Sequence, residues 1–205
     1  MTIEEPDHDL AELFGVQLDK RELASLYAQL VVRAGNEGLL DVSYRTVDSP
    51  VGTLLLAATR IGLVRIAYEH EGLDAVLRTL ADKVSPRILE ERRRLDAAAR
   101  QLEEYFARRR SRFELPLDLC LSAGFRRSVL TYLPQIDYGT TASYQAVAAA
   151  VHNPRAMRAV GSACATNPLP IVIPCHRVIR SDGQLGAYLG GPEVKHQLLD
   201  LETHR

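Results

Sequence analysis

The stretch PIVIPCHRVIR, residues 170–180, places Cys175 between a proline and a histidine at the end of a short apolar run. The prolines around this run restrict its backbone and predict a short buried strand at residues 171–173, with Pro174 setting the direction of Cys175. One interpretation is structural, because free cysteines are often small core residues. The adjacent His176 favours another, in which an imidazole helps to form a nucleophilic thiolate.

An imidazole next to the thiol in sequence seldom faces it directly. We therefore expect His176 to take the proton of Cys175 through a water molecule, and this role requires a carboxylate that orients the imidazole. Spacing alone does not choose among the acidic residues of the C-terminal part, which are Asp137, Asp182, Glu193, Asp200 and Glu202.

The composition predicts a soluble, globular chain, whose 205 residues suffice for one large domain or two small ones. No apolar run approaches the roughly 20 residues of a membrane span, and the acidic N-terminus does not resemble a signal peptide. Three widely separated cysteines, without a Cys-x-x-Cys pair, argue against a disulfide framework and against a metal site. A reducing, cytoplasmic location is therefore expected. Cys120 and Cys164 are expected in the core.

The net charge of −1 hides an uneven distribution. Residues 1–40 contain eight acidic and three basic residues, whereas residues 41–205 contain eighteen acidic and twenty-two basic ones. A mildly basic body permits nucleic-acid binding without requiring it. Any such binding must use a local surface.

Residues 1–40 are expected to form an acidic helical extension. Apolar residues at intervals of three and four predict helices at 9–15 and 19–35, packed on the body as a hairpin. Asp19 and Glu22 resemble a capping box, and Gly35 is expected to end the second helix.

Residues 41–118 are expected to form an α/β domain with a small β-sheet. Alternating apolar runs separated by turn residues predict a meander of three strands, followed by helices and one more strand. The predicted strands span 42–47, 53–59, 63–69 and 112–119, and the predicted helices span 73–84 and 92–110. The basic run at 92–94 is expected on a solvated helix face.

Residues 119–205 are expected to form a mainly α-helical domain. Its predicted helices span 124–136, 143–152 and 153–167, the second capped by Ser143 and the third opened by Asn153 and Pro154. The two short helices with a tight connection suggest a helix-turn-helix. The last helix is rich in small residues and carries Arg155 and Arg158. It can pack closely either on another helix or in a nucleic-acid groove, and the pattern leaves both open.

The sequence NPLPIVIPCHRVIRSDGQLGAYLGG, residues 167–191, resembles the active-site signature of the O6-alkylguanine-DNA alkyltransferases, also called methylated-DNA–protein-cysteine methyltransferases. The similarity includes YGTTASYQAVAAAVHNPRAMRAVG at 138–161 and VKHQLLDLE at 194–202, and it covers residues 41–204. The Pro-Cys-His-Arg-Val core with its upstream Asn-Pro is far more specific than a lone Cys-His pair. Residues 1–40 fall outside the resemblance.

The resemblance implies a role for each matching residue. Cys175 would accept the alkyl group, His176 would activate it through a water molecule, and Glu202 would hold the imidazole. Tyr144 would donate a hydrogen bond to the guanine as it leaves.

Contacts to DNA are implied in the same way. Arg158 would be a finger that fills the gap left by the extruded base, with Arg155 available for the backbone. Asn167 would be the hinge between the recognition helix and the active-site strand. The substrate pocket would be lined by Pro170, Val178, Tyr188, Leu189 and Gly190.

The implied reaction is DNA repair. The alkyl group of O6-alkylguanine, and of O4-alkylthymine, would pass irreversibly to Cys175 in a single turnover, after the nucleotide is rotated out of a duplex bound through its minor groove. Double-stranded DNA would be the partner, with no cofactor, no metal and no obligate protein partner. Leu189 departs from the family pattern because many relatives carry a small residue there.

Two other functions stay open. A non-catalytic damage sensor would share the helix-turn-helix and the arginine finger, but the known sensors that resemble alkyltransferases lack the cysteine. A Cys-His hydrolase of unrelated fold would need an oxyanion hole and would turn over.

Overall fold

A computed structural model describes residues 19–203 of the chain, which divides into two compact units, Met1–Leu40 and Asp41–Arg205. The helix expected at 9–15 lies outside the described residues. None of the helices within 19–203 combines the length and the apolar composition needed to cross a membrane.

The described part of the first unit is the helix α2 (Lys20–Asn36) and its flanking residues. The capping box is confirmed: the Asp19 carboxylate accepts the N–H of Glu22 at 2.8 Å, and the Glu22 carboxylate accepts the N–H of Asp19 at 3.0 Å. Gly35 does not end the helix as expected. The chain leaves the helical conformation further on, where Gly38 takes a φ of 70°. The packing of this helix on the body stays a prediction.

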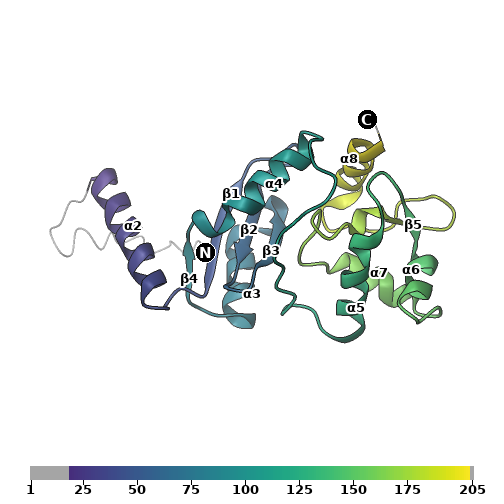
Figure 1. The fold of residues 1–205 in the computed structure, drawn as a ribbon, viewed down its shortest axis with the longest axis horizontal. Helices are drawn as coiled ribbons and strands as arrows, with labels where there is room; N and C mark the ends of the chain where they lie inside the picture. The colour runs from purple at the N-terminus through teal and green to yellow at the C-terminus, as the bar shows by residue number, and fades with distance from the viewer. Residues whose placement is uncertain (1–18, 204–205) are drawn as a thin grey trace, which may run out of the picture. The chain divides into compact units, whose positions relative to one another are not determined.

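The second unit begins with a four-stranded sheet in the order β3-β2-β1-β4 (Figure 1). Its strands are β1 (Val42–Val47), β2 (Leu54–Ala58), β3 (Leu63–Tyr68) and β4 (Ile88–Glu90). The first three are antiparallel neighbours and confirm the meander, whereas β4 pairs in parallel with β1. The strand β4 was not predicted, because it has three residues and no alternating pattern.

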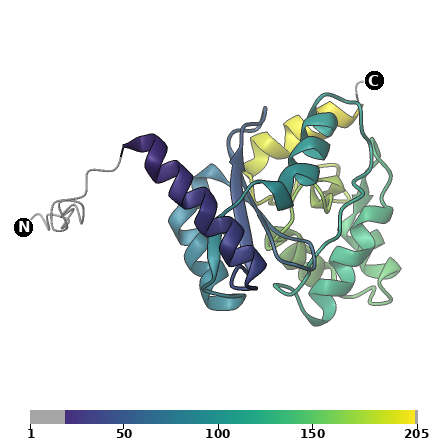
Figure 2. The same cartoon turned by 60° about the vertical axis from the view of Figure 1, so that its left-hand side comes forward.

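Each face of the sheet is covered by a helix (Figure 2). The helices are α3 (Leu73–Lys83) and α4 (Asp96–Phe106). Successive side chains of a strand point to opposite faces, which explains why every residue of β2 is buried. One face packs Leu54, Leu56 and Ile66 with Leu95, Ala98 and Leu102; the other packs Leu55, Ala57 and Val64 with Val76 and Leu80.

Two predictions for this part of the chain were wrong. The helix expected from residue 92 starts at Asp96, because the Glu91 carboxylate accepts the N–H groups of Arg93 and Arg94 and holds them in a 3₁₀ turn. The basic run is therefore not on an α-helix. Residues 112–119 form no strand but a single bridge to Leu63, which is consistent with the missing N–H of the proline at 116.

The remainder of the unit is mainly helical. Its elements are α5 (Gly124–Tyr132), α6 (Tyr144–Ala150), α7 (Met157–Ala165) and α8 (Gly191–Thr203), the 3₁₀ turns η3 (Leu133–Gln135) and η4 (Cys175–Arg177), and the short parallel pair β5 (Ala142–Ser143) and β6 (Val178–Ile179). The helices α5 and α6 both pack against α7. The α/β part followed by a mainly α-helical part confirms the expected fold class.

Two predicted helix boundaries need correction. The helix from residue 124 changes to 3₁₀ geometry at Leu133, where Pro134 follows. Ser143 caps α6 as expected, but α7 begins at Met157, since Asn153 and Pro154 form a turn closed by the N–H of Ala156.

Residues 171–173 are buried as expected but are not a strand. Ile171 has a φ of 73°, and the N–H of Ile173 returns to the carbonyl of Leu169 at 2.8 Å. The prolines at 168, 170 and 174 have no N–H for a strand ladder, so the run folds into consecutive tight turns. These turns bring Cys175 back against the end of α7.

The approach of residues 116–117 to β3 depends on Gly62, where a Cβ atom would overlap the Pro116 carbonyl and lie 2.8 Å from the Leu117 nitrogen. We expect Gly62→Ala to lower the free energy of unfolding by about 2 kcal/mol, because backbone atoms must move to admit the methyl group. Urea unfolding measures it. The control is Gly35→Ala, where nothing lies within 4 Å of the added atom. Equal stability of the two variants would contradict this packing.

Candidate active site

Cys175 opens the turn η4 and is 1% exposed. Its Sγ accepts a hydrogen bond from Asn167 Nδ2 at 3.1 Å, and the same amide donates to the Ile173 carbonyl at 2.9 Å. Asn167 Oδ1 accepts the N–H of Leu169 at 3.0 Å. The buried amide of Asn167 thus bonds to Leu169, to Ile173 and to the Cys175 thiol. The expected role of Asn167 as a hinge did not include the contact with the thiol.

The electrostatic surroundings of the thiol act in opposite directions. Burial raises the pKa of Cys175 to about 11, although the Asn167 hydrogen bond and the charge of Lys195 favour the thiolate. The resting group is therefore a neutral thiol at pH 7, and it needs a base to release its proton.

His176 and Glu202 form the pair expected from the resemblance. His176 Nε2 lies 2.9 Å from Glu202 Oε1, and both side chains are buried. Since a carboxylate only accepts, Nε2 carries the proton. Nδ1 is buried and hydrogen-bonds to no protein group among residues 19–203. Burial lowers the pKa of His176, so the imidazole is neutral with its lone pair on Nδ1.

The other carboxylates considered have different partners or positions. Asp137 pairs with Arg112, Asp182 with Arg180 and Asp200 with His196, all on the exposed surface. Glu193 is exposed in the first turn of α8. Packing, and not spacing, therefore brings Glu202 to the imidazole.

Glu202 is also the centre of a larger network that the sequence analysis missed. Arg177 donates to both carboxylate oxygens at 2.9 and 3.0 Å and to the Ile136 carbonyl at 2.6 Å. The Tyr105 hydroxyl donates at 2.7 Å and the Gly139 N–H at 3.2 Å. Burial alone would raise the pKa of Glu202, but hydrogen bonds from His176 and Arg177 outweigh it and lower the pKa to about 2. The carboxylate is ionised at neutral pH.

Lys195 is a second buried charge that sequence reasoning missed. It is fully buried on α8, and its Nζ donates to the Val178 carbonyl at 2.6 Å and the Gly186 carbonyl at 3.3 Å. Burial lowers its pKa, whereas the negative charge of a thiolate at the nearby Cys175 would raise it. Its place in VKHQLLDLE gave no signal, because a lysine on a helix is usually exposed.

Tyr144 begins α6 and is half-buried. A Cβ atom at Gly186 would overlap its hydroxyl, so only a glycine lets the loop before α8 pass this close. Burial raises the pKa of Tyr144 to about 12, which keeps the hydroxyl protonated as a donor.

The residues assigned to the pocket are only partly brought together. Tyr188 is buried with its ring edge-on to His176, at 6.3 Å between centroids. Val178 is buried on β6, and Leu189 and Gly190 are half-buried in the loop before α8. Pro170 is buried in the turns before Cys175, and no described contact joins it to the loop.

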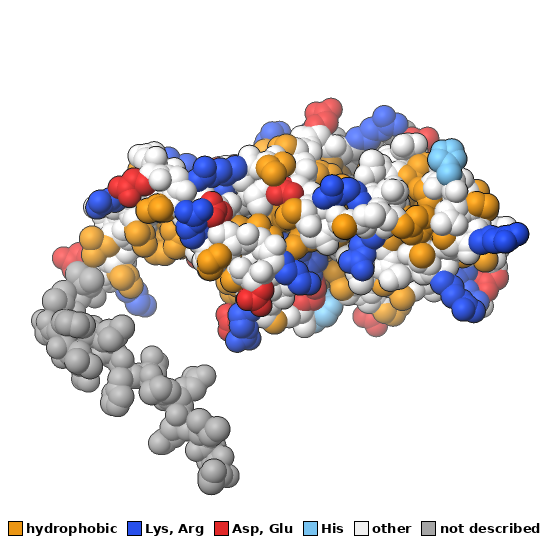
Figure 3. Space-filling model, turned by 90° about the horizontal axis from the view of Figure 1, so that it is seen from below, with side chains coloured by type: hydrophobic (Ala, Val, Ile, Leu, Met, Phe, Trp, Pro, Cys, Tyr) orange, Lys and Arg blue, Asp and Glu red, His pale blue; other side chains and the backbone are white. Residues whose placement is uncertain are grey.

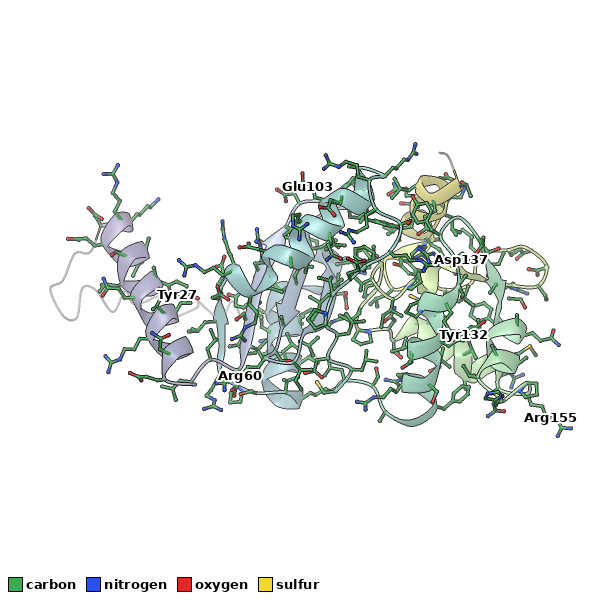
Figure 4. The ribbon with its side chains drawn as sticks, viewed as in Figure 1. Tyr27, Arg60, Glu103, Tyr132, Asp137 and Arg155 are labelled. Atoms are coloured by element: carbon green, nitrogen blue, oxygen red, sulfur yellow. The ribbon has the colours of Figure 1, made fainter. Side chains whose placement is uncertain are left out.

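The arginines assigned to DNA lie on the surface. Arg158 is exposed on α7, and Arg155 is in the turn before it, where Figure 4 shows its side chain pointing away from the helices. The opposite side of α7 buries Val160, Ala163 and Cys164 against neighbouring helices. Helix packing and an outward-facing cationic side thus coexist on one helix. Asn167 follows α7 and points inward.

Positive charge is concentrated in this part of the sequence. Residues 124–180 contain six arginines and one acidic residue, Asp137. Arg177 is buried and pairs with Glu202, whereas the other five arginines of this range are exposed. Figure 3 shows one face of the molecule, where Lys and Arg side chains are dispersed among hydrophobic and neutral ones.

The two remaining cysteines differ. Cys164 is buried, as expected. Cys120 is exposed, so its core assignment was wrong: Asp118 accepts its backbone N–H at 3.0 Å and the chain turns there at the surface.

A buried thiol beside an imidazole–carboxylate pair, in a part of the chain with an arginine-bearing helix, is typical of a nucleic-acid-directed cysteine transferase. Comparison with known proteins identifies the family. Residues 42–119 match the ribonuclease-like domain, and residues 124–204 the DNA binding domain, of 6-O-methylguanine DNA methyltransferase. The chain belongs to this family, and the resemblance drawn from the sequence is confirmed.

Named relatives agree. Methylated-DNA–protein-cysteine methyltransferase of Methanosarcina barkeri is 39% identical over 161 residues, which are 78% of this chain and 97% of the relative. The constitutive enzyme of Bacillus subtilis is 37% identical over 163 residues, covering 78% and 94%. The O6-methylguanine methyltransferase structure of Mycobacterium tuberculosis superposes with a TM-score of 0.70 at 37% identity, covering 80% of this chain and 94% of that one.

The Glu202 network predicts a large effect of Arg177 on stability. We expect Arg177→Met to lower the free energy of unfolding by about 3–5 kcal/mol, because it leaves a buried carboxylate without its cationic partner. The matched control is Arg180→Met, whose ion pair with Asp182 is exposed and whose loss should cost under about 1 kcal/mol. Urea unfolding of both variants makes the comparison. Equal losses would contradict the network.

Proposed function

We propose that this chain repairs alkylated DNA by moving the alkyl group from O6 of guanine, and from O4 of thymine, to the thiol of Cys175. The observation that carries the proposal is the buried series Cys175, His176 and Glu202, in which the imidazole is held by its Nε2 and keeps Nδ1 for a proton. The proposal is also supported by a Mycobacterium tuberculosis structure described as OGT in complex with DNA, with 35% identity and a TM-score of 0.69 over 78% of this chain.

The reaction is a displacement at the alkyl carbon. The thiol proton passes to His176 Nδ1, through a water molecule, and the thiolate attacks the carbon. An S–C bond forms, the C–O6 bond breaks, and its electron pair stays on the guanine. The Tyr144 hydroxyl, protonated at neutral pH, donates to the ring and stabilises the developing negative charge.

The product explains a single turnover. An S-alkylcysteine is a thioether without a good leaving group, and the route uses no activated donor and no reductant. Each chain therefore accepts one alkyl group and is not regenerated. A hydrolase, by contrast, would need an oxyanion hole and release its acyl group.

The burial of the thiol supports the proposal that the target nucleotide is flipped out of the duplex. With Cys175 1% exposed, a guanine stacked in a duplex cannot bring its O6 substituent to the sulfur. The nucleotide must rotate out, which costs a few kcal/mol of stacking and pairing. Arg158, exposed on α7, offsets part of this cost by filling the gap, with α7 in the minor groove and Arg155 on the backbone.

The stoichiometry of Cys175 tests the proposal. After incubation with excess duplex DNA containing O6-methylguanine, the peptide with Cys175 should gain one methyl group, as measured by mass spectrometry. Cys175→Ala should bind the DNA and leave the methyl group in place. A Cys175→Ala variant that demethylates DNA, or a wild-type chain that turns over repeatedly, would refute it; binding without any methylation would indicate a damage sensor.

A variant of Arg158 distinguishes an effect on base flipping from an effect on methyl transfer itself. Arg158→Ala should slow methyl transfer from duplex DNA by about tenfold or more, because the flipped state loses its stabilisation, and should change reaction with the free base by less than about twofold. The control Arg92→Ala removes another exposed arginine, which lies before α4. Second-order rates on both substrates give the answer. If Arg158→Ala lowered the second-order rates on duplex DNA and on the free base equally, the role of Arg158 in base flipping would be refuted.

A further inference from the structure

The loop at residues 185–191 is held by side chains from a distant part of the chain. The Tyr68 hydroxyl, at the end of β3, lies 2.8 Å from the Tyr188 hydroxyl, and both are buried. His70, in the 3₁₀ turn η1 (Glu69–Glu71), places Nε2 3.1 Å from the Leu189 carbonyl. At Gly190, an added Cβ would be 2.7 Å from the Tyr68 ring. Three consecutive loop residues are thus fixed from the sheet.

The two holding side chains are themselves well fixed. Their rings stack, with centroids 5.8 Å apart and planes 13° from parallel. The Glu71 carboxylate accepts the backbone N–H of Tyr68 at 2.9 Å and pairs with the guanidinium of Arg65. β3 is one of the two edge strands of the sheet (Figure 1), so its outer backbone groups are free to bond with residues outside the sheet.

The strand β3 also contacts Pro168, in the segment that leads to Cys175. The N–H of Ile66 donates to the Pro168 carbonyl at 2.8 Å, and Arg65 donates to it at 3.4 Å. Pro168 directly follows Asn167, whose amide contacts the Cys175 sulfur. β3 and η1 therefore contact both the segment before Cys175, at Pro168, and the 185–191 loop after it.

We propose that Tyr68 and His70 are positioning residues that fix the 185–191 loop and so limit the size of the alkyl group that the site accepts. This rests on the proposed function, with Leu189 as one wall of the substrate site. For the loop backbone at Leu189 to move aside, the Leu189 carbonyl must leave His70 and the adjacent Tyr188 must leave Tyr68. A methyl group needs no such movement, whereas a benzyl group does.

The chemistry of the two contacts selects the test variants. The Leu189 carbonyl only accepts, so His70 Nε2 is the donor. His70→Gln can keep a donor at that point, while His70→Ala removes it. Tyr68→Phe removes one hydroxyl and keeps the ring against Gly190. His196→Ala is the matched control, a histidine whose contact is an exposed pair with Asp200.

The first measurement is independent of alkyl transfer. Hydrogen exchange with mass spectrometry, on the full chain, should show faster exchange of the peptide at 185–191 in His70→Ala and Tyr68→Phe. His70→Gln and His196→Ala should match the wild type. Unchanged exchange in both His70→Ala and Tyr68→Phe would overturn the proposal.

The second measurement is the ratio of second-order rates for O6-benzylguanine and O6-methylguanine as free bases. His70→Ala and Tyr68→Phe should each raise the benzyl-to-methyl ratio by about fivefold, the effect of one lost hydrogen bond, and His70→Gln should restore it. Leu189→Ser, which removes the wall, should raise the ratio as well. An equal fall of both rates would show a structural role alone and overturn the proposal.

The two measurements separate this inference from the proposed function. If exchange at 185–191 rises in His70→Ala but Cys175 of the wild type gains no alkyl group, the positioning contact stands and the proposed function fails. If the wild type transfers methyl groups and the ratio stays constant in every variant of Tyr68 and His70, the proposed function stands and the size limit fails.

Discussion

The carboxylate of Glu202 is the constraint on which the active site depends. A buried charge is costly unless it is surrounded by donors, and this one receives hydrogen bonds from His176, Arg177, Tyr105 and Gly139. These partners come from α4, the turn before β5 and η4. Because they meet at one carboxylate, the place of the imidazole, and with it that of Cys175, is determined by the packing of α8 against the rest of the unit.

The helix α8 contacts the segment around Cys175 at two positions. Glu202 holds the imidazole, and Lys195 holds the Val178 and Gly186 carbonyls and adds positive charge near the thiol. The strand β3, at one edge of the sheet, also supports the site, through Pro168 and the 185–191 loop. The segment that carries the buried Cys175 thiol is therefore held by both the sheet and the last helix, so the sheet contributes to the candidate site.

Local patterns predicted a good part of this arrangement. Alternation predicted the three-stranded meander, and Ser143 predicted the start of α6. The motif around Cys175 identified the family and paired His176 with Glu202. The strand expected at 171–173 was wrong because prolines that bound a strand equally favour turns. The hydrogen bonds of Arg177 and Tyr105 to Glu202, and of Lys195 to Val178, were not predicted. They join residues far apart in sequence, where no periodic pattern indicates a contact.

The proposed proton transfer from Cys175 depends on a neutral His176 imidazole that is protonated on Nε2 and free to accept a proton on Nδ1. Nitrogen-15 NMR of histidine-labelled protein, with the His176 signals assigned from a His176→Asn variant, measures this state directly. At pH 7 we expect a neutral ring whose proton is on Nε2, since burial lowers the pKa of His176 and Glu202 accepts from Nε2. An imidazolium at pH 7, or a neutral ring with its proton on Nδ1, would contradict the account.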